Sequence, residues 1–127
     1  MADPLAGLLE AHRVVPVVVL SDAGAASPLG EALVAGGLPC AEVTFRRPAA
    51  AEALRALAAD PRLFVGAGTV ISRDQVDRAV AAGARFVVSP GFSRSVVHHC
   101  GDVGVPVLPG VATATELMAA LDEGSTW

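Results

Sequence analysis

The stretch Ala79–Pro90 reads Ala-Val-Ala-Ala-Gly-Ala-Arg-Phe-Val-Val-Ser-Pro. Its alanines favour a helix, Gly83 is a typical helix stop, and the β-branched residues that follow favour a strand. The stretch Ala32–Val43, Ala-Leu-Val-Ala-Gly-Gly-Leu-Pro-Cys-Ala-Glu-Val, resembles it and has the same order of parts. This internal echo predicts a fold made of repeated helix–strand units.

Both stretches belong to a longer alternation of short apolar runs and alanine- and leucine-rich runs. The predicted strands are Val14–Leu20, Cys40–Phe45, Leu63–Ala67, Arg85–Ser89 and Val105–Leu108. The predicted helices are Ser27–Val34, Pro48–Ala59, Ser72–Ala82, Ser93–Cys100 and Thr113–Leu121, two of which open with capping-box spacings. The strands begin 20 to 26 residues apart. Helices between successive strands predict right-handed crossovers and a parallel α/β sheet.

The regular period suits either a βα barrel or a doubly wound sheet. A complete eight-unit barrel needs about 200 residues or more, whereas this chain has 127. Only five strands with their following helices fit, so the chain can supply only part of a barrel. No linker or low-complexity tract divides it, and we expect residues 1–127 to belong to a single domain.

Composition excludes several classes of protein. Apolar residues make up 53% of the chain and charged residues 17%, which argues against disorder. The formal net charge is −4 without a basic stripe, so we expect neither nucleic acid nor membrane as a partner. Two cysteines without a CxxC pattern indicate a cytoplasmic protein. All nine basic residues are arginines, so no lysine of this chain can form a Schiff base.

Ligands bind at the carboxyl ends of parallel strands, so these ends are the place to look for function. The second predicted strand ends at Glu42-Val-Thr-Phe-Arg46. Side chains alternate along a strand, which places Glu42, Thr44 and Arg46 on one face. A carboxylate on the inner face of such a sheet is costly unless it is paired or functional. Glu42 and Arg46 are therefore either a structural ion pair or a catalytic carboxylate beside an anion-binding arginine.

The third and fourth strands end in weaker signals. Val65-Gly-Ala-Gly-Thr-Val70 has glycines that let a ligand approach the backbone, and the Thr69 hydroxyl could bind a carboxylate or phosphate. Pro90 could form a pocket wall. From these residues alone, a tight strand-to-helix turn is the favoured interpretation of both segments. Ser89 has no evident His or Asp partner in the sequence, which argues against a nucleophilic serine.

The run His98-His-Cys100 suggests metal ligands only superficially. Successive helical residues point about 100° apart, so these side chains converge poorly on one ion. No second pair of ligands is evident in the sequence. We therefore expect no metal site.

Several segments, taken in order, carry a resemblance that covers the chain from about Leu5 to Gly124. They are Val14–Val19, Ala41–Arg46, Val65–Val70, Val88–Gly91, Pro106–Gly110 and Ala114–Met118. Together they resemble the bacterial 2-keto-3-deoxy-6-phosphogluconate and 4-hydroxy-2-oxoglutarate aldolases. The resemblance implies about five of the eight units of a (β/α)8 TIM barrel. It also implies a homotrimeric class I aldolase, in which a lysine forms a Schiff base with the pyruvyl carbonyl and no metal or organic cofactor is required.

The resemblance assigns roles to four residues. Glu42 matches the general acid/base, and Arg46 matches the arginine that binds the carboxylate of the keto-acid substrate. Thr69 matches a substrate-contacting threonine, and Pro90 matches a pocket proline. The family's Schiff-base lysine lies on the sixth strand, which does not occur within these 127 residues. We therefore expect an amino-terminal portion of an aldolase that alone cannot perform the reaction.

Two alternatives remain open at this point. One is a truncated, non-catalytic paralogue that binds keto acids or full-length subunits. The other is a different sugar-phosphate barrel, similar to thiamine phosphate synthases or epimerases. The segment Glu42–Arg46 argues against the second alternative, because it stands where the aldolases have their acid and their carboxylate-binding arginine.

Overall fold

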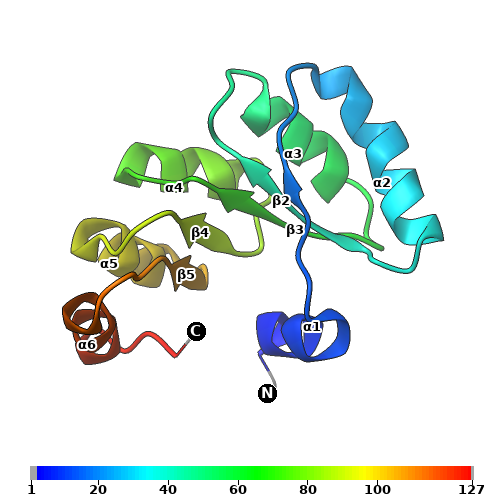
Figure 1. Ribbon diagram of the computed structural model, residues 1–127. Helices are drawn as coiled ribbons and strands as arrows, with labels where there is room; N and C mark the ends of the chain where they lie inside the picture. Colours follow the sequence, from blue (N-terminus) through cyan, green and yellow to red (C-terminus); the bar gives the residue numbers. More distant parts are fainter. Residues whose placement is uncertain (1–2, 127) are drawn as a thin grey trace.

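The structure is a computed structural model that describes residues 3–126 (Figure 1). Met1, Ala2 and Trp127, which belong to the predicted 1–127 unit, lie outside the described residues. Helices and strands alternate along the chain, as the sequence pattern predicts. In order they are α1 (Pro4–His12), β1 (Val17–Val18), the 3₁₀ turn η1 (Ala23–Ala25), α2 (Ala26–Ala35), β2 (Cys40–Thr44), α3 (Ala50–Ala58), β3 (Phe64–Gly68), α4 (Arg73–Ala81), β4 (Val87–Ser89), α5 (Arg94–Val103), β5 (Val107–Pro109) and α6 (Ala114–Asp122).

The strand order decides between the two architectures that the sequence left open. The five strands are all parallel and lie in the order β1-β2-β3-β4-β5, so each strand pairs with its neighbour along the chain. A doubly wound sheet would reverse its order at a switch point and would place helices on both faces. Here α2 to α5 lie side by side along one face (Figure 1). The arrangement is that of part of a βα barrel.

The apolar core lies between the sheet and this layer of helices. Strand β2 shows how the alternation of side chains produces it: Ala41 and Val43 are fully buried in the core, and Glu42 and Thr44 lie on the opposite face. The core side chains on the helices come mainly from α3, α4 and α5, and include Leu54, Val76 and Val96 among others. The predicted separation of Glu42 from Val43 is thus confirmed, and one face of the sheet remains available for a site.

Several predicted boundaries differ from the structure by a few residues, and three of them are instructive. Of the first predicted strand, Val14–Leu20, only Val17–Val18 is a strand in the structure. Pro16 has no N–H to donate, and its carbonyl accepts from the Glu42 amide. The helix predicted from Pro48 begins at Ala50 because the chain turns first. The helix predicted to end at Cys100 continues to Val103, where Gly104 closes it in the left-handed conformation.

Helix α1 is absent from the predicted elements. It has its own signals: the Asp3 carboxylate accepts from the Leu5 amide, Pro4 occupies the first turn, and Arg13 ends the helix in the left-handed conformation. Leu5 is fully buried. Among residues 3–126, no helix is long and apolar enough to cross a bilayer.

Candidate functional site

The carboxyl ends of β2, β3, β4 and β5 lie along one edge of the sheet, because the strands are parallel and adjacent. Each predicted site residue lies just before or just after one of these ends. Glu42 is inside β2 and Arg46 follows it. Thr69 follows β3 directly, and Pro90 follows β4. Arg46 and Thr69 are 23 residues apart in the chain, and Thr69 and Pro90 are 21 residues apart. The fold thus brings distant segments to one edge of the sheet.

Glu42 is half-buried on the face of the sheet away from the helices. Its side chain lies over Gly68 on the neighbouring strand: a Cβ added to Gly68 would stand only 1.8 Å from the Glu42 Oε1 atom. Burial raises the pKa of the Glu42 carboxyl, and the charge of Arg46 acts in the opposite direction but is weaker. A carboxyl with a raised pKa is suited to receive and return a proton.

Arg46 extends from the turn after β2 toward the end of β3. Its Nε atom donates to the Thr69 hydroxyl at 3.4 Å, and the guanidinium is otherwise exposed. Within residues 3–126, Arg46 and Glu42 do not approach to within 4.0 Å, so the structural ion pair that the sequence allowed is not formed. The guanidinium therefore keeps donors that can bind a carboxylate in a bidentate manner.

Thr69 stands at the site in a strained backbone conformation. Its φ is 56°, in the left-handed region that β-branched residues rarely adopt. This conformation turns the chain from β3 toward α4 and presents the hydroxyl to Arg46. Strain of this kind persists where surrounding structure enforces it, and it is concentrated at functional sites.

Thr44 lies on the same face of the sheet as Glu42, as the alternation along the strand predicts, but the sequence assigns it no role. It is buried, and its hydroxyl has no hydrogen-bond partner among the described residues. A buried hydroxyl without a partner is uncommon and calls for an explanation. The alternation of the strand was the available signal, because it placed Thr44 beside Glu42.

Pro90 forms part of a neighbouring hollow and has no hydrogen bond to the Glu42 group. This hollow, of about 190 Å³, is lined by Pro90, Gly91, Gly110, Val111, Ala112 and Glu116. Ser89, which precedes Pro90, is buried, and its hydroxyl donates to the Gly91 carbonyl at 2.8 Å. The Ser89 hydroxyl therefore closes a turn.

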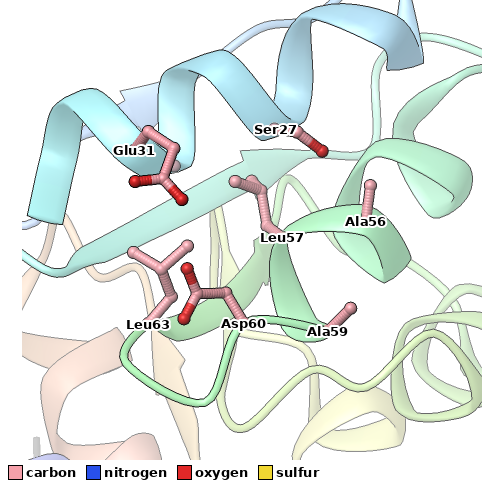
Figure 2. Close-up of a pocket in the computed structure, with 8 residues that line it drawn as sticks. Ser27, Glu31, Ala56, Leu57, Ala59, Asp60 and Leu63 are labelled. Atoms are coloured by element: carbon pink, nitrogen blue, oxygen red, sulfur yellow. The ribbon is translucent and has the colours of Figure 1, made fainter.

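Figure 2 shows a different cavity, of about 250 Å³, between α2 and α3. Glu31 and Asp60 point into it beside Leu57 and Leu63. Arg62 bonds both carboxylates, at 2.7 Å and 2.6 Å, so its charge offsets part of theirs. None of the residues that line it comes from the carboxyl ends of the strands. We regard this cavity as a structural feature of the helical layer.

The adjacent histidines of α5, His98 and His99, point toward different helices. His98 pairs with Glu123 just beyond α6, whereas His99 pairs with Asp77 of α4 at 2.7 Å. In the part of the chain that the structure describes, no three His, Cys, Asp or Glu side chains are grouped as metal ligands would be.

The sequence model for the KDPG and KHG aldolases matches residues 6–127. The 2-dehydro-3-deoxy-phosphogluconate aldolase of Treponema pallidum is 51% identical over 117 residues, which are 91% of this chain and 56% of the relative. The KHG/KDPG aldolase of Escherichia coli K12 is 40% identical over 92% of this chain and 55% of its own length.

Solved structures of aldolases also superpose closely. The 2-keto-3-deoxy-6-phosphogluconate aldolase of Zymomonas mobilis ZM4, crystallised with 3-phosphoglycerate, has a TM-score of 0.91 and 40% identity, covering 98% of this chain and 59% of that one. The KDPG aldolase of Legionella pneumophila, crystallised with pyruvate captured as a covalent carbinolamine, has a TM-score of 0.87 and 44% identity. It covers 92% of this chain and 57% of that one.

The chain spans about half the length of the curated relatives that it matches. Within that span the agreement is continuous and includes all five strands. It decides against the thiamine phosphate synthase-like and epimerase-like alternatives. The chain belongs to the KDPG and KHG aldolase family.

Proposed function

We propose that this chain supplies the keto-acid-binding and proton-transfer half of a class I aldolase site. The observation that carries the proposal is the convergence of Glu42, Arg46 and Thr69 at the carboxyl edge of β2 and β3. The substrate is 2-keto-3-deoxy-6-phosphogluconate or 4-hydroxy-2-oxoglutarate. The products are pyruvate and an aldehyde, glyceraldehyde 3-phosphate or glyoxylate.

Each residue has a distinct task in this reaction. The Arg46 guanidinium binds the substrate carboxylate, because its planar donors match the two oxygens and carry the opposite charge. The Thr69 hydroxyl oxygen accepts a hydrogen bond from the Arg46 Nε atom and so holds the guanidinium in place. The same hydroxyl can donate its hydrogen to that carboxylate. Glu42 transfers protons as the carbinolamine forms and as the bond between C3 and C4 breaks. Its raised pKa brings the carboxyl closer to the pH at which it must exchange a proton.

The amine that forms the Schiff base comes from outside these 127 residues, since the sequence contains no lysine. We place the remaining barrel units, which carry that amine, on the open edge of the sheet. We also propose that the assembled enzyme is a homo-oligomer, a trimer as the family resemblance implies, that acts in the cytoplasm in sugar-acid breakdown.

A chimera tests the proposal directly. Residues 1–127 replace the part of the Treponema pallidum aldolase that they match, and pyruvate release is followed with a coupled dehydrogenase. We expect cleavage of 2-keto-3-deoxy-6-phosphogluconate. Glu42→Gln should lower kcat by about 100-fold or more, as loss of a general acid/base does. A folded chimera in which Glu42→Gln retains full activity would contradict the assigned role.

The absence of lysine favours a second function, binding of a keto acid without cleavage. In that case the Arg46 and Thr69 pair is used for recognition alone, and full-length subunits are the partners. The chimera separates the two functions: an inactive, folded chimera that still binds pyruvate would support the second.

A further inference from the structure

Gly68 is the residue most closely covered by the candidate acid/base. A Cβ at this position would lie 1.8 Å from the Glu42 Oε1 atom, 2.4 Å from its Cδ and 2.5 Å from its Cγ. All three contacts are to one side chain. Real Cβ atoms essentially never approach so closely, so any other residue here would have to displace Glu42.

Backbone conformation does not explain this glycine. The glycines with positive φ are Gly37, Gly83, Gly104 and Gly124, and Gly68 is not among them. Its backbone lies in a strand that is regular up to its last residue. The requirement for glycine is therefore one of space on the inner face of the sheet.

Gly66, two residues earlier on the same strand, supports this distinction. A Cβ there would meet the Phe86 ring at 2.5 Å and not Glu42. Phe86 is fully buried and stacks on Phe64, with ring centroids 5.8 Å apart. The two glycines of β3 thus make room for different neighbours, an apolar ring at Gly66 and a carboxylate at Gly68.

We propose that Gly68 is a positioning residue, whose missing side chain forms the cradle that holds the Glu42 carboxylate against the sheet. This inference rests on the proposed role of Glu42 as the proton-transfer group. The cradle keeps the carboxylate half-buried on the face that also carries Thr44, and on the edge where Arg46 meets Thr69.

The cradle also accounts for the direction in which the Glu42 pKa is shifted. Burial is the cause that raises the pKa of this carboxyl, and Arg46 opposes it. A methyl group at position 68 would move the carboxylate outward into solvent or toward Arg46. Both movements favour the charged form, so both lower the pKa.

The test is an NMR titration of the Glu42 side-chain carboxyl in the 127-residue chain, assigned by the signal that disappears in Glu42→Gln. We expect the midpoint to move to lower pH in Gly68→Ala. It should stay in place in Gly91→Ala, since a Cβ at Gly91 meets nothing within 4 Å. Gly66→Ala, which strains the Phe86 packing, should also leave it in place. An unchanged midpoint in folded Gly68→Ala would overturn the proposal.

A double-mutant cycle covers the case in which Gly68→Ala folds but is too unstable for the NMR titration. Removing the carboxylate with Glu42→Ala removes the atoms that the new methyl would meet. Gly68→Ala should therefore lower Tm much less in the Glu42→Ala chain than in the wild type. An equal loss in both backgrounds would show that Gly68 serves the backbone and not Glu42. Neither measurement depends on aldolase activity, so failure of the proposed function would be seen separately, in the chimera.

Discussion

Burial of Glu42 raises the pKa of its carboxyl, and this gives the free energy of unfolding a pH dependence. The folded chain holds this proton more tightly than the unfolded chain does. The stabilisation is therefore complete below the ordinary pKa of glutamate and is lost as the pH rises through the folded pKa. At neutral pH the Glu42 carboxyl therefore opposes folding relative to a side chain that stays neutral in both states.

The substitution Glu42→Gln should accordingly raise Tm at pH 7, because the amide remains neutral. At about pH 3 both chains carry a neutral group at position 42, and their Tm values should converge. Thermal melts at the two pH values, followed by circular dichroism, measure the difference. A Tm that falls at pH 7 would show that the ionised carboxylate stabilises the fold.

The positive φ of Thr69 predicts an unusual order of stability among its variants. Alanine at this position keeps the left-handed strain, whereas glycine removes it. We expect Thr69→Gly to be more stable than Thr69→Ala by about 1 kcal/mol, despite the greater freedom of glycine in the unfolded chain. Urea unfolding measures the difference. The opposite order would mean that Thr69 carries no strain.

For single residues, the sequence predicted which side chains share a face of the sheet but not which contacts they make there. Alternation placed Glu42 beside Thr44 and opposite Val43, and the structure confirms this. It could not predict the cradle at Gly68 or the φ of Thr69. Both depend on the register of β2 against β3, which is a contact between segments distant in the sequence.

Helix α6 begins with a complete capping box. The Thr113 hydroxyl accepts from the Glu116 amide, and the Glu116 carboxylate accepts from the Thr113 and Ala112 amides. Thr113→Ala should cost about 1 kcal/mol of stability, because it leaves an amide at the first turn without its partner. Thr115→Ala, exposed on the same helix, is the matched control and should change little. Equal losses in urea unfolding would contradict the cap.

The end of α6 is joined to α5 through Glu123, which bonds both His98 and Arg94. The hydrogen bond from His98, and then those of Arg94, lower the pKa of the Glu123 carboxyl. This contribution to stability is present above the ordinary pKa of glutamate and is lost as the pH falls through the folded pKa. Glu123→Gln should lower Tm at pH 6, and the difference should shrink as the pH falls below the ordinary pKa of glutamate. A constant difference would exclude an ionic contribution.

Elements with local signals were the ones that the sequence could predict. The Ser72 and Thr113 caps and the Gly83 stop identified α4 and α6 to within a residue or two. Strand β1 was overestimated because five valines around Pro16 look like a continuous strand, while only Val17 and Val18 find a partner. The length of an edge strand is set by its neighbour, which a local pattern does not contain.

At the scale of the whole molecule, apolar side chains are exposed at both ends of the open sheet. Val17 is 64% exposed at the β1 edge, and Met118 and Leu121 on α6 are 65% and 59% exposed. Surfaces of this kind favour association. We therefore expect the 127-residue chain to self-associate through α6.

Sedimentation velocity at increasing protein concentration tests this expectation. Met118→Lys with Leu121→Lys should shift the distribution toward the monomer. Val103→Lys, on the less exposed end of α5, should not. A wild-type chain that sediments as a monomer at all concentrations would contradict the predicted association.

The βα period predicted the parallel sheet and the number of strands, which the structure confirms. It did not separate a barrel from a doubly wound sheet, because both have the same alternation along the chain. The spatial order of the strands separates them, and that order is set by pairing between segments distant in the sequence.

The most direct test of the account is a pyruvate titration of the isotope-labelled chain, followed by the backbone amide signals around Glu42, Arg46 and Thr69. We predict saturable shifts confined to the ends of β2 and β3. Arg46→Ala should weaken binding by about 10-fold or more, the value of a lost charge-assisted hydrogen bond, and Arg47→Ala should not. Pyruvate binding that is equal in the wild type and in Arg46→Ala, or shifts that lie elsewhere on the fold, would contradict the keto-acid site proposed for this chain.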